Sequence, residues 1–169
     1  STTILHNSAI HSYHINIYTI RTHTHFTNSR IDINTNPDLY MQTTSSDIGN
    51  VLRAIYNCSK TNNGLIIDVF NESITQDECT DMIEILSKNQ IGVLLEAGVP
   101  EGTKIAHKHG WADGEPIADA GIVFSPSGDY VIVIYIWTPE YTYWDENARI
   151  LSNLNKAVYY HFNPIIQSR

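Results

Sequence analysis

The sequence has few basic residues, few cysteines and no long hydrophobic run. Its ten Lys and Arg residues are outnumbered by 18 Asp and Glu residues, which gives a formal net charge of −8. Because binding to a phosphate backbone requires clustered Lys and Arg, these scattered residues argue against nucleic acid as a partner. No stretch approaches the ~20 consecutive apolar residues that cross a bilayer, so no membrane span is expected.

The length of 169 residues suits one domain with a single core. The chain starts at Ser1 and shows no signal peptide, which predicts a processed form or a fragment. Cys58 and Cys79 are the two cysteines, and both fall in segments that we expect to be helical. We therefore predict buried free thiols, with a disulfide between them as the alternative.

Residues 1–25 differ in composition from the rest of the chain. They hold one charged residue, Arg21, among many Thr and Ile, and His14–Ile20 alternates loosely, as a strand does. Five histidines lie here: His6, His11, His14, His23 and His25. We divide the chain into this atypical segment, 1–25, and one partial domain, 26–169.

Helix signals become clear after residue 43. Thr44 to Asp47 has the composition of a helix start, and apolar residues follow at helical spacing from Ile48. Thr75 to Glu78 matches a capping box. A last helix is predicted over 145–161, where apolar residues again recur on one face.

Three strands are predicted between these helices, over residues 104–109, 119–124 and 130–137. The turn 125–129 joins the second strand to the third and has hairpin composition. The third strand is apolar at nearly every position, which is typical of a strand covered on both faces. The expected fold class is therefore α+β, with helices packed on an antiparallel sheet.

Three segments resemble a known family, and they follow one another along the chain in the same order as in that family. Residues 95–110 read LEAGVPEGTKIAHKHG, residues 119–123 read DAGIV, and residues 43–48 read TTSSDI. They resemble the approach to the Lys-Thr-Gly strand, the next strand and the helix after the omega loop in class A β-lactamases and penicillin-binding D-Ala-D-Ala peptidases. The resemblance covers about residues 26–163 and implies a β-lactamase/transpeptidase-like fold that apparently lacks its N-terminal part.

In that family, N-terminal strands complete the sheet beside the strand that corresponds to 130–137. Without them, an apolar strand would expose an unpaired edge, which favours aggregation. The His-rich N-terminal segment, a second chain or an omitted segment could each cover that edge. The sequence leaves all three alternatives open.

The resemblance also implies a site. Lys108 and Gly110 match the Lys and Gly that bind the substrate carboxylate and keep the strand surface bare, and the Trp111 N–H would contribute to an oxyanion hole. His109 stands where the family has Thr or Ser. Its ring can still donate to a carboxylate, but it is bulkier and titrates near neutral pH.

The family's nucleophile motif is missing from the sequence. No serine is followed by Lys at the third position, and Ser59, Ser125 and Ser127 are interpreted as structural. Asn7 is a possible remnant of the Ser-Asp-Asn motif. The omega-loop Glu has no convincing counterpart, which leaves the catalytic residues unknown.

Three hypotheses follow. The first is a serine β-lactamase-like hydrolase domain that acts on β-lactam or D-Ala-D-Ala-type amides by acyl-enzyme chemistry, incompetent as this isolated chain. The second is a catalytically inactive binding or structural domain on the same scaffold. The third is metal binding through the pairs His11 and His14, His23 and His25, and His107 and His109. We disfavour it because no acidic or Cys ligand accompanies them at a recognised spacing.

The expected partners are a β-lactam or a peptidoglycan stem peptide and a complementing chain or segment, with no cofactor and no metal. By resemblance, the setting is periplasmic or extracellular.

Overall fold

The computed structural model describes residues 2–6, 12–15, 23–24, 42–70, 73–113, 116–138 and 141–164. Its strands are β1 (Thr2–His6), β2 (Ser12–Ile15), β3 (His23–Thr24), β4 (Gln42–Thr43), β5 (Ile105–Trp111), β6 (Ile117–Val123) and β7 (Tyr130–Ile136). Its helices are α1 (Ser45–Thr61), α2 (Leu65–Phe70), α3 (Gln76–Ser87), the short 3₁₀ helix η1 (Glu96–Gly98) and α4 (Trp144–Phe162).

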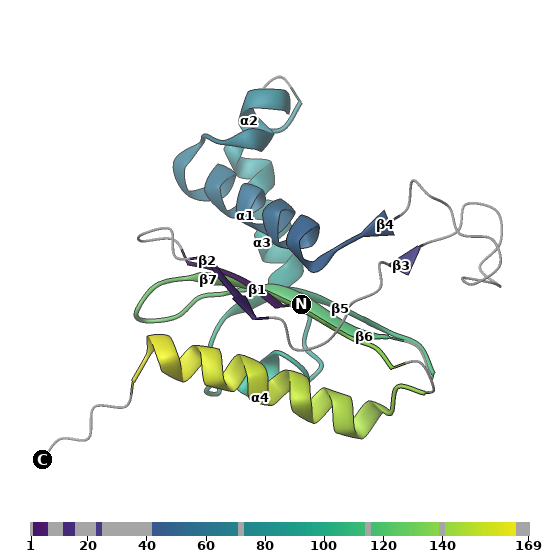
Figure 1. The fold of residues 1–169 in the computed structure, drawn as a ribbon. Coiled ribbons are helices and arrows are strands. Elements are labelled where there is room, and N and C mark those ends of the chain that lie inside the picture. The colour runs from purple at the N-terminus through teal and green to yellow at the C-terminus, as the bar shows by residue number, and fades with distance from the viewer. Residues whose placement is uncertain are drawn as a thin grey trace, which may run out of the picture.

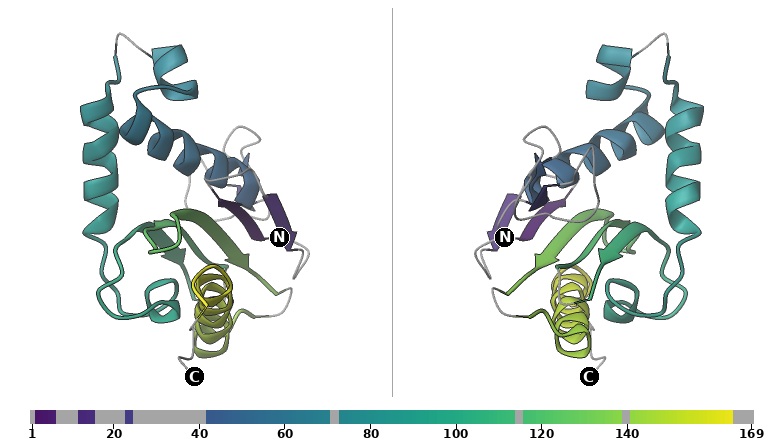
Figure 2. Two further views of the ribbon diagram at one scale, coloured as in Figure 1. Left: turned by 90° about the vertical axis from the view of Figure 1, so that its left-hand side faces the viewer. Right: turned by 90° about the vertical axis from the view of Figure 1, so that its right-hand side faces the viewer.

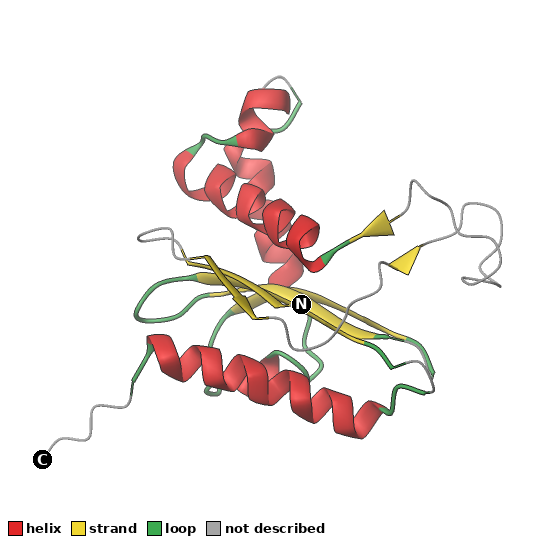
Figure 3. Ribbon diagram, in the orientation of Figure 1, coloured by secondary structure: helices red, strands yellow, loops and turns green. Residues whose placement is uncertain are grey.

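The architecture is a sheet with helices on both faces. Five antiparallel strands lie in the order β2-β1-β7-β6-β5. The long helix α4 covers one face, while α1 and α3 stand on the other (Figures 1 and 2). Figure 3 shows the same arrangement by secondary structure. The predicted α+β class is confirmed.

Each face of the sheet has its own hydrophobic core. On one face, residues such as Ile132 and Ile134 of β7 pack with Leu151 of α4. On the other face, Val131 and Val133 pack with residues of α1 and α3. All residues of β7 except one are buried, as its unbroken apolar run predicts.

The edge of β7 is covered by the N-terminal segment of the same chain. β1 pairs with β7 in antiparallel register, from Thr3 opposite Val133 to His6 opposite Tyr130, and β2 adds a further strand outside β1. Of the three alternatives that the sequence leaves open, the structure therefore has the first. The strand expected over His14–Ile20 is described only at its start, within β2, and residues 16–20 lie outside the described part.

The predicted helix starts are confirmed by their hydrogen bonds. The Asp47 carboxylate accepts the Thr44 N–H at 3.0 Å, and the Thr44 hydroxyl accepts the Asp47 N–H at 3.1 Å. The Glu78 carboxylate accepts the Thr75 N–H at 2.6 Å. The short helix α2 was not expected, because its apolar run has no helical period and none of its residues is buried.

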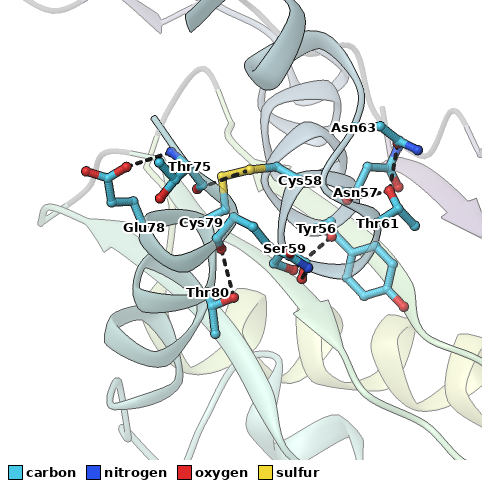
Figure 4. Close-up of a disulfide and its surroundings, with 11 residues drawn as sticks. Tyr56, Asn57, Cys58, Ser59, Thr61, Asn63, Thr75, Glu78, Cys79 and Thr80 are labelled. Carbon is cyan, nitrogen blue, oxygen red and sulfur yellow. Dashed lines mark hydrogen bonds between the residues drawn. A yellow bond between two sulfur atoms is a disulfide. The ribbon is translucent and has the colours of Figure 1, made fainter. Parts of the chain in front are cut away.

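Cys58 of α1 and Cys79 of α3 form a disulfide (Figure 4), so the prediction of free thiols is wrong. Each cysteine faces inward from its own helix, and the packing of α1 against α3 brings the two Cα atoms to 6.0 Å. The pairing depends on that tertiary contact, which the period of either helix alone does not reveal. Closing a loop of this length stabilises the fold by about 3 kcal/mol in the chain-entropy account.

Among the described residues, no helix combines the length and the hydropathy of a membrane span.

Candidate functional site

The Lys-His-Gly sequence lies on β5, at the edge of the sheet. Within the described residues, β6 is the only strand that pairs with β5. The strand is longer than predicted and extends to Trp111, so Lys108 to Trp111 all belong to it. An edge strand leaves one row of backbone N–H and C=O groups available to a ligand.

The register of the sheet shows which backbone groups face outward. The N–H of Phe124 donates to the carbonyl of Lys104 at 3.0 Å, so Lys104 belongs to the set of residues that bond toward β6. Because bonded and non-bonded pairs alternate along an antiparallel ladder, His107, His109 and Trp111 direct their N–H and C=O away from β6. The N–H of Trp111, predicted as an oxyanion donor, therefore points out of the sheet edge.

Two hydrogen bonds agree with this assignment. The amide Nδ2 of Asn89 donates to the carbonyl of His107 at 3.3 Å, and Lys108 Nζ donates to the carbonyl of His109 at 2.6 Å. Both carbonyls thus accept from groups outside the sheet. The row of outward groups on β5 is accessible to side chains and, by the same geometry, to a ligand.

Side chains of β5 alternate between the two faces. Ala106 belongs to the core beneath α1 and α3, so Lys108 and Gly110, which follow at intervals of two, project to that face. Lys108 is exposed, and a Cβ placed on Gly110 would meet no atom within 4 Å. The strand surface at Gly110 is therefore open, as the family resemblance implies.

His109 lies on the opposite face and is held by a neighbour. Its Nδ1 lies 3.1 Å from the Asn89 amide nitrogen, and the ring is half-buried. Since Nδ2 of Asn89 donates, Nδ1 accepts, which leaves Nε2 as the ring position that carries a proton. His109 thus carries its N–H donor on the face opposite the Lys108 side chain.

A buried charged cluster lies behind the strand and was not predicted. Nδ1 of His107 lies 2.9 Å from Asp119 of β6, and its Nε2 lies 2.8 Å from Glu96 of η1. The side chains of His107 and Asp119 are fully buried. Gly121 lies opposite His107, and a Cβ there would come within 2.7 Å of the His107 Cβ, so only Gly allows this close approach of β6 to β5.

The cluster favours a protonated imidazole. Burial lowers the pKa of His107, but the hydrogen bond and charge of Asp119, and then those of Glu96, raise it by more, so the pKa is raised overall. Burial raises the pKa of Glu96, but the N–H groups of Ile91 and Gly92, together with His107, lower it by more. Two carboxylate acceptors require both ring nitrogens to donate, which only the imidazolium can do.

This geometry argues against the metal hypothesis for His107 and His109. Both nitrogens of His107 are engaged with carboxylates, and the two rings are 6.4 Å apart, centre to centre. In the part of the chain that the structure describes, no group of three or more His, Cys, Asp or Glu side chains is arranged to hold a metal ion.

The other candidate residues are placed as follows. The hydroxyl of Ser59 donates to the carbonyl of Tyr56, and that of Ser125 donates to the carbonyl of Gly128. These local bonds agree with a structural interpretation of both serines. Asn7 lies outside the described residues.

A large open cavity of about 880 Å³ lies beside the start of β5, lined by residues of α3, η1 and the connections around them. Glu96 is among its lining residues and thereby joins the cavity wall to the buried cluster. A smaller cavity of about 300 Å³ lies at the other end of β5, beside Trp111.

Comparison with known proteins identifies a family. A model of the family described as "Beta-lactamase enzyme family" matches residues 3–162. The comparison with curated proteins found no match.

Solved structures show the same fold. PBP-A matches with a TM-score of 0.57 and 23% identity, over 79% of this chain and 46% of its own. A β-lactamase from Sphaerobacter thermophilus DSM 20745 matches with a TM-score of 0.57 and 19% identity, over 75% and 43%. The TLA-1 extended-spectrum β-lactamase matches with a TM-score of 0.56 and 22% identity, over 73% and 42%. The chain thus spans less than half the length of these structures.

Proposed function

Since the chain belongs to the β-lactamase enzyme family, we propose that the edge of β5 binds the carboxylate of a β-lactam or of a D-Ala-D-Ala-type peptide. Lys108 is the proposed cation for the carboxylate, and the outward Trp111 N–H is the proposed donor to the oxyanion. The ring of His109 projects to the face opposite Lys108 and does not converge on the same carboxylate. The observation that carries the proposal is the joint placement of an exposed ammonium, an open glycine and outward N–H groups on one edge strand.

The proposed chemistry is acyl transfer. A serine hydroxyl attacks the amide carbonyl and gives its proton to a lysine, and the Trp111 N–H stabilises the oxyanion of the tetrahedral intermediate. The amide C–N bond then breaks, and the departing nitrogen takes up the proton. Because this sequence has no Ser-x-x-Lys, a segment or chain outside it must provide the nucleophile. One solved relative, a variant of PBP-A, is an acyl-enzyme complex with penicillin G, which supports the same substrate class here.

A catalytically inactive binding domain on the same scaffold is the second candidate. It is favoured by His109, whose Nδ1 is already engaged by Asn89, in place of a freely rotating hydroxyl. In that case the edge of β5 binds the carboxylate, and no acylation follows even when a further segment or chain is present.

We place the protein in the periplasm or outside the cell. The Cys58–Cys79 disulfide supports this proposal, because such bonds persist in oxidising compartments and are rare in the cytosol.

The test measures binding and acylation together. Benzylpenicillin is titrated into the chain by isothermal calorimetry, and the intact mass is recorded after incubation. We expect reversible binding that Lys108→Ala weakens about ten-fold or more, since charge-assisted hydrogen bonds to a carboxylate contribute about 1.5–3 kcal/mol. Lys104→Ala is the matched control, because Lys104 lies just before the same strand and pairs with Glu84 instead.

Equal affinities for Lys108→Ala and the unmodified chain would overturn the proposed anchor. A stable mass adduct on the chain alone would overturn the need for an outside nucleophile, and peptide mapping would then locate the reactive residue.

A further inference from the structure

The smaller cavity combines aromatic rings with carboxylates. It is formed where β5 ends and α4 begins, and has a volume of about 300 Å³. Its aromatic and acidic lining residues are Trp111, Asp113, Tyr141, Tyr143, Trp144, Asp145 and Glu146. This volume is at the lower end of the range for small-molecule sites.

Three of the four aromatic residues are exposed, although they are large apolar groups, and Trp144 is partly buried. Trp111 is 57% exposed, Tyr141 41% and Tyr143 63%. They are grouped in two contacting pairs: Trp111 lies 5.0 Å from Trp144 and Tyr141 lies 4.8 Å from Tyr143, between ring centres. Grouped exposed rings are typical of surfaces that bind a ligand.

The charge of the cavity is negative. Three carboxylates and no Lys or Arg occur among its described lining residues. Asp145 and Glu146 are also expected in the first turn of α4, where they face the positive end of the helix dipole. Asp113 lies outside α4, so the helix dipole does not account for its charge. The hydroxyl of Tyr141 donates to its carboxylate and holds it in place.

We propose that this cavity binds an organic ammonium ion, either a quaternary amine or an alkylammonium. A cation is attracted both by the faces of Trp and Tyr rings and by the carboxylates, whereas an anion is repelled. Methyl or methylene groups on the nitrogen bury against the same rings. The inference does not depend on the proposed carboxylate site, because the side chains of Lys108 and Trp111 project to opposite faces of the sheet.

The test uses choline and its neutral isostere 3,3-dimethylbutan-1-ol, each titrated into the whole chain at constant ionic strength and followed by calorimetry and tryptophan fluorescence. We expect choline to bind roughly ten- to thirty-fold more tightly than the isostere, as a desolvated cation–π contact allows. Asp113→Asn and Trp111→Leu should each weaken choline binding by about ten-fold.

Asp129→Asn is the matched control, because the hydroxyl of Tyr56 donates to Asp129 at 2.7 Å in a second Tyr–Asp pair outside the cavity. Choline binding that depends on Asp113 but not on Asp129 supports the proposal. Equal affinity for choline and the isostere overturns it, as does the absence of choline binding. Binding of N-acetylglucosamine in place of choline would assign the cavity to a carbohydrate instead.

Discussion

Replacing His107 by Ala is expected to destabilise the fold strongly. The side chain of Asp119 is fully buried, and the imidazolium is its cationic partner. After the substitution, the Leu95 N–H, at 3.3 Å, is the remaining hydrogen bond recorded for that carboxylate. Removing one partner of a buried ion pair costs about 3–5 kcal/mol, because the other charge stays buried without compensation.

That loss is large against a total stability of about 5–15 kcal/mol for a single domain. With a urea m-value of about 1–3 kcal/mol/M, it lowers the urea midpoint by roughly 1–5 M. The assay is urea unfolding at pH 6, followed by far-UV circular dichroism. The control is His109→Ala, which removes one hydrogen bond from a half-buried ring and should cost about 1 kcal/mol or less.

A loss for His107→Ala no larger than that for His109→Ala would refute the buried ion pair. The double variant of His107 and Asp119 to Ala gives a second check. It should be less destabilised than the sum of the two single variants, because no unpaired charge remains.

The pH dependence of stability follows from the same cluster. The pKa of His107 is raised, so its contribution is complete below the unfolded value of about 6.5 and is lost as pH rises through the higher folded value. The pKa of Glu96 is lowered, so its contribution is complete above the unfolded value of about 4.5 and is lost as pH falls through the lower folded value. Between about pH 4.5 and pH 6.5, both groups therefore contribute fully to the free energy of unfolding. A His107→Gln variant should lose the decline on the alkaline side, and an unchanged alkaline slope in that variant would contradict the assignment.

Three further stability predictions can be checked by thermal and urea unfolding. Cys79→Ser, or reduction of the disulfide with Cys58, should cost about 3 kcal/mol, and no change in melting temperature on reduction would contradict the cross-link. Gly98→Ala should cost about 1–3 kcal/mol, because its Cβ would lie 2.5 Å from a backbone oxygen of α4. The control Gly110→Ala should change stability by less than about 0.5 kcal/mol, and equal effects of the two substitutions would refute the close approach of η1 to α4. Asn155→Ala should cost about 2–4 kcal/mol, since it leaves a buried tyrosine hydroxyl and a buried carbonyl without their shared partner, and a loss below that of an exposed Asn153→Ala would contradict this account.

The features that sequence predicted well are local. The starts of α1 and α3 depend on hydrogen bonds between residues three positions apart, such as Thr44 and Asp47. Such bonds can be predicted from the sequence of the few residues involved. The double burial of β7 likewise follows from its uninterrupted apolar run. Neither prediction needs knowledge of distant contacts.

The features that sequence missed or left open depend on distant contacts. The disulfide requires α1 to pack on α3. The covering of the β7 edge requires β7 to pair with β1, a strand far away in the sequence. The buried cluster requires the register of β5 and β6, which places His107 opposite Gly121 and diagonal to Asp119. If β5 and β6 are assumed to form a hairpin, their register predicts the contact between His107 and Asp119. Nothing in the sequence predicts that Glu96 lies beside His107.

The candidate site was accessible from sequence only in part. Lys108 and Gly110 stand out through a family resemblance, and the outward N–H of Trp111 follows once the strand is known to pair on one side. The aromatic cavity was not found, because its rings come from the end of β5 and from residues 141–144, some thirty positions later.

The pairing of β1 with β7 has a consequence for how the chain folds. Thr3 must find Val133, a contact of very high sequence separation, and such contacts slow folding because the long loop must close first. The pairing of β1 with β7 is therefore expected to form after the local hairpin of β6 and β7, and until it forms the apolar edge of β7 stays uncovered.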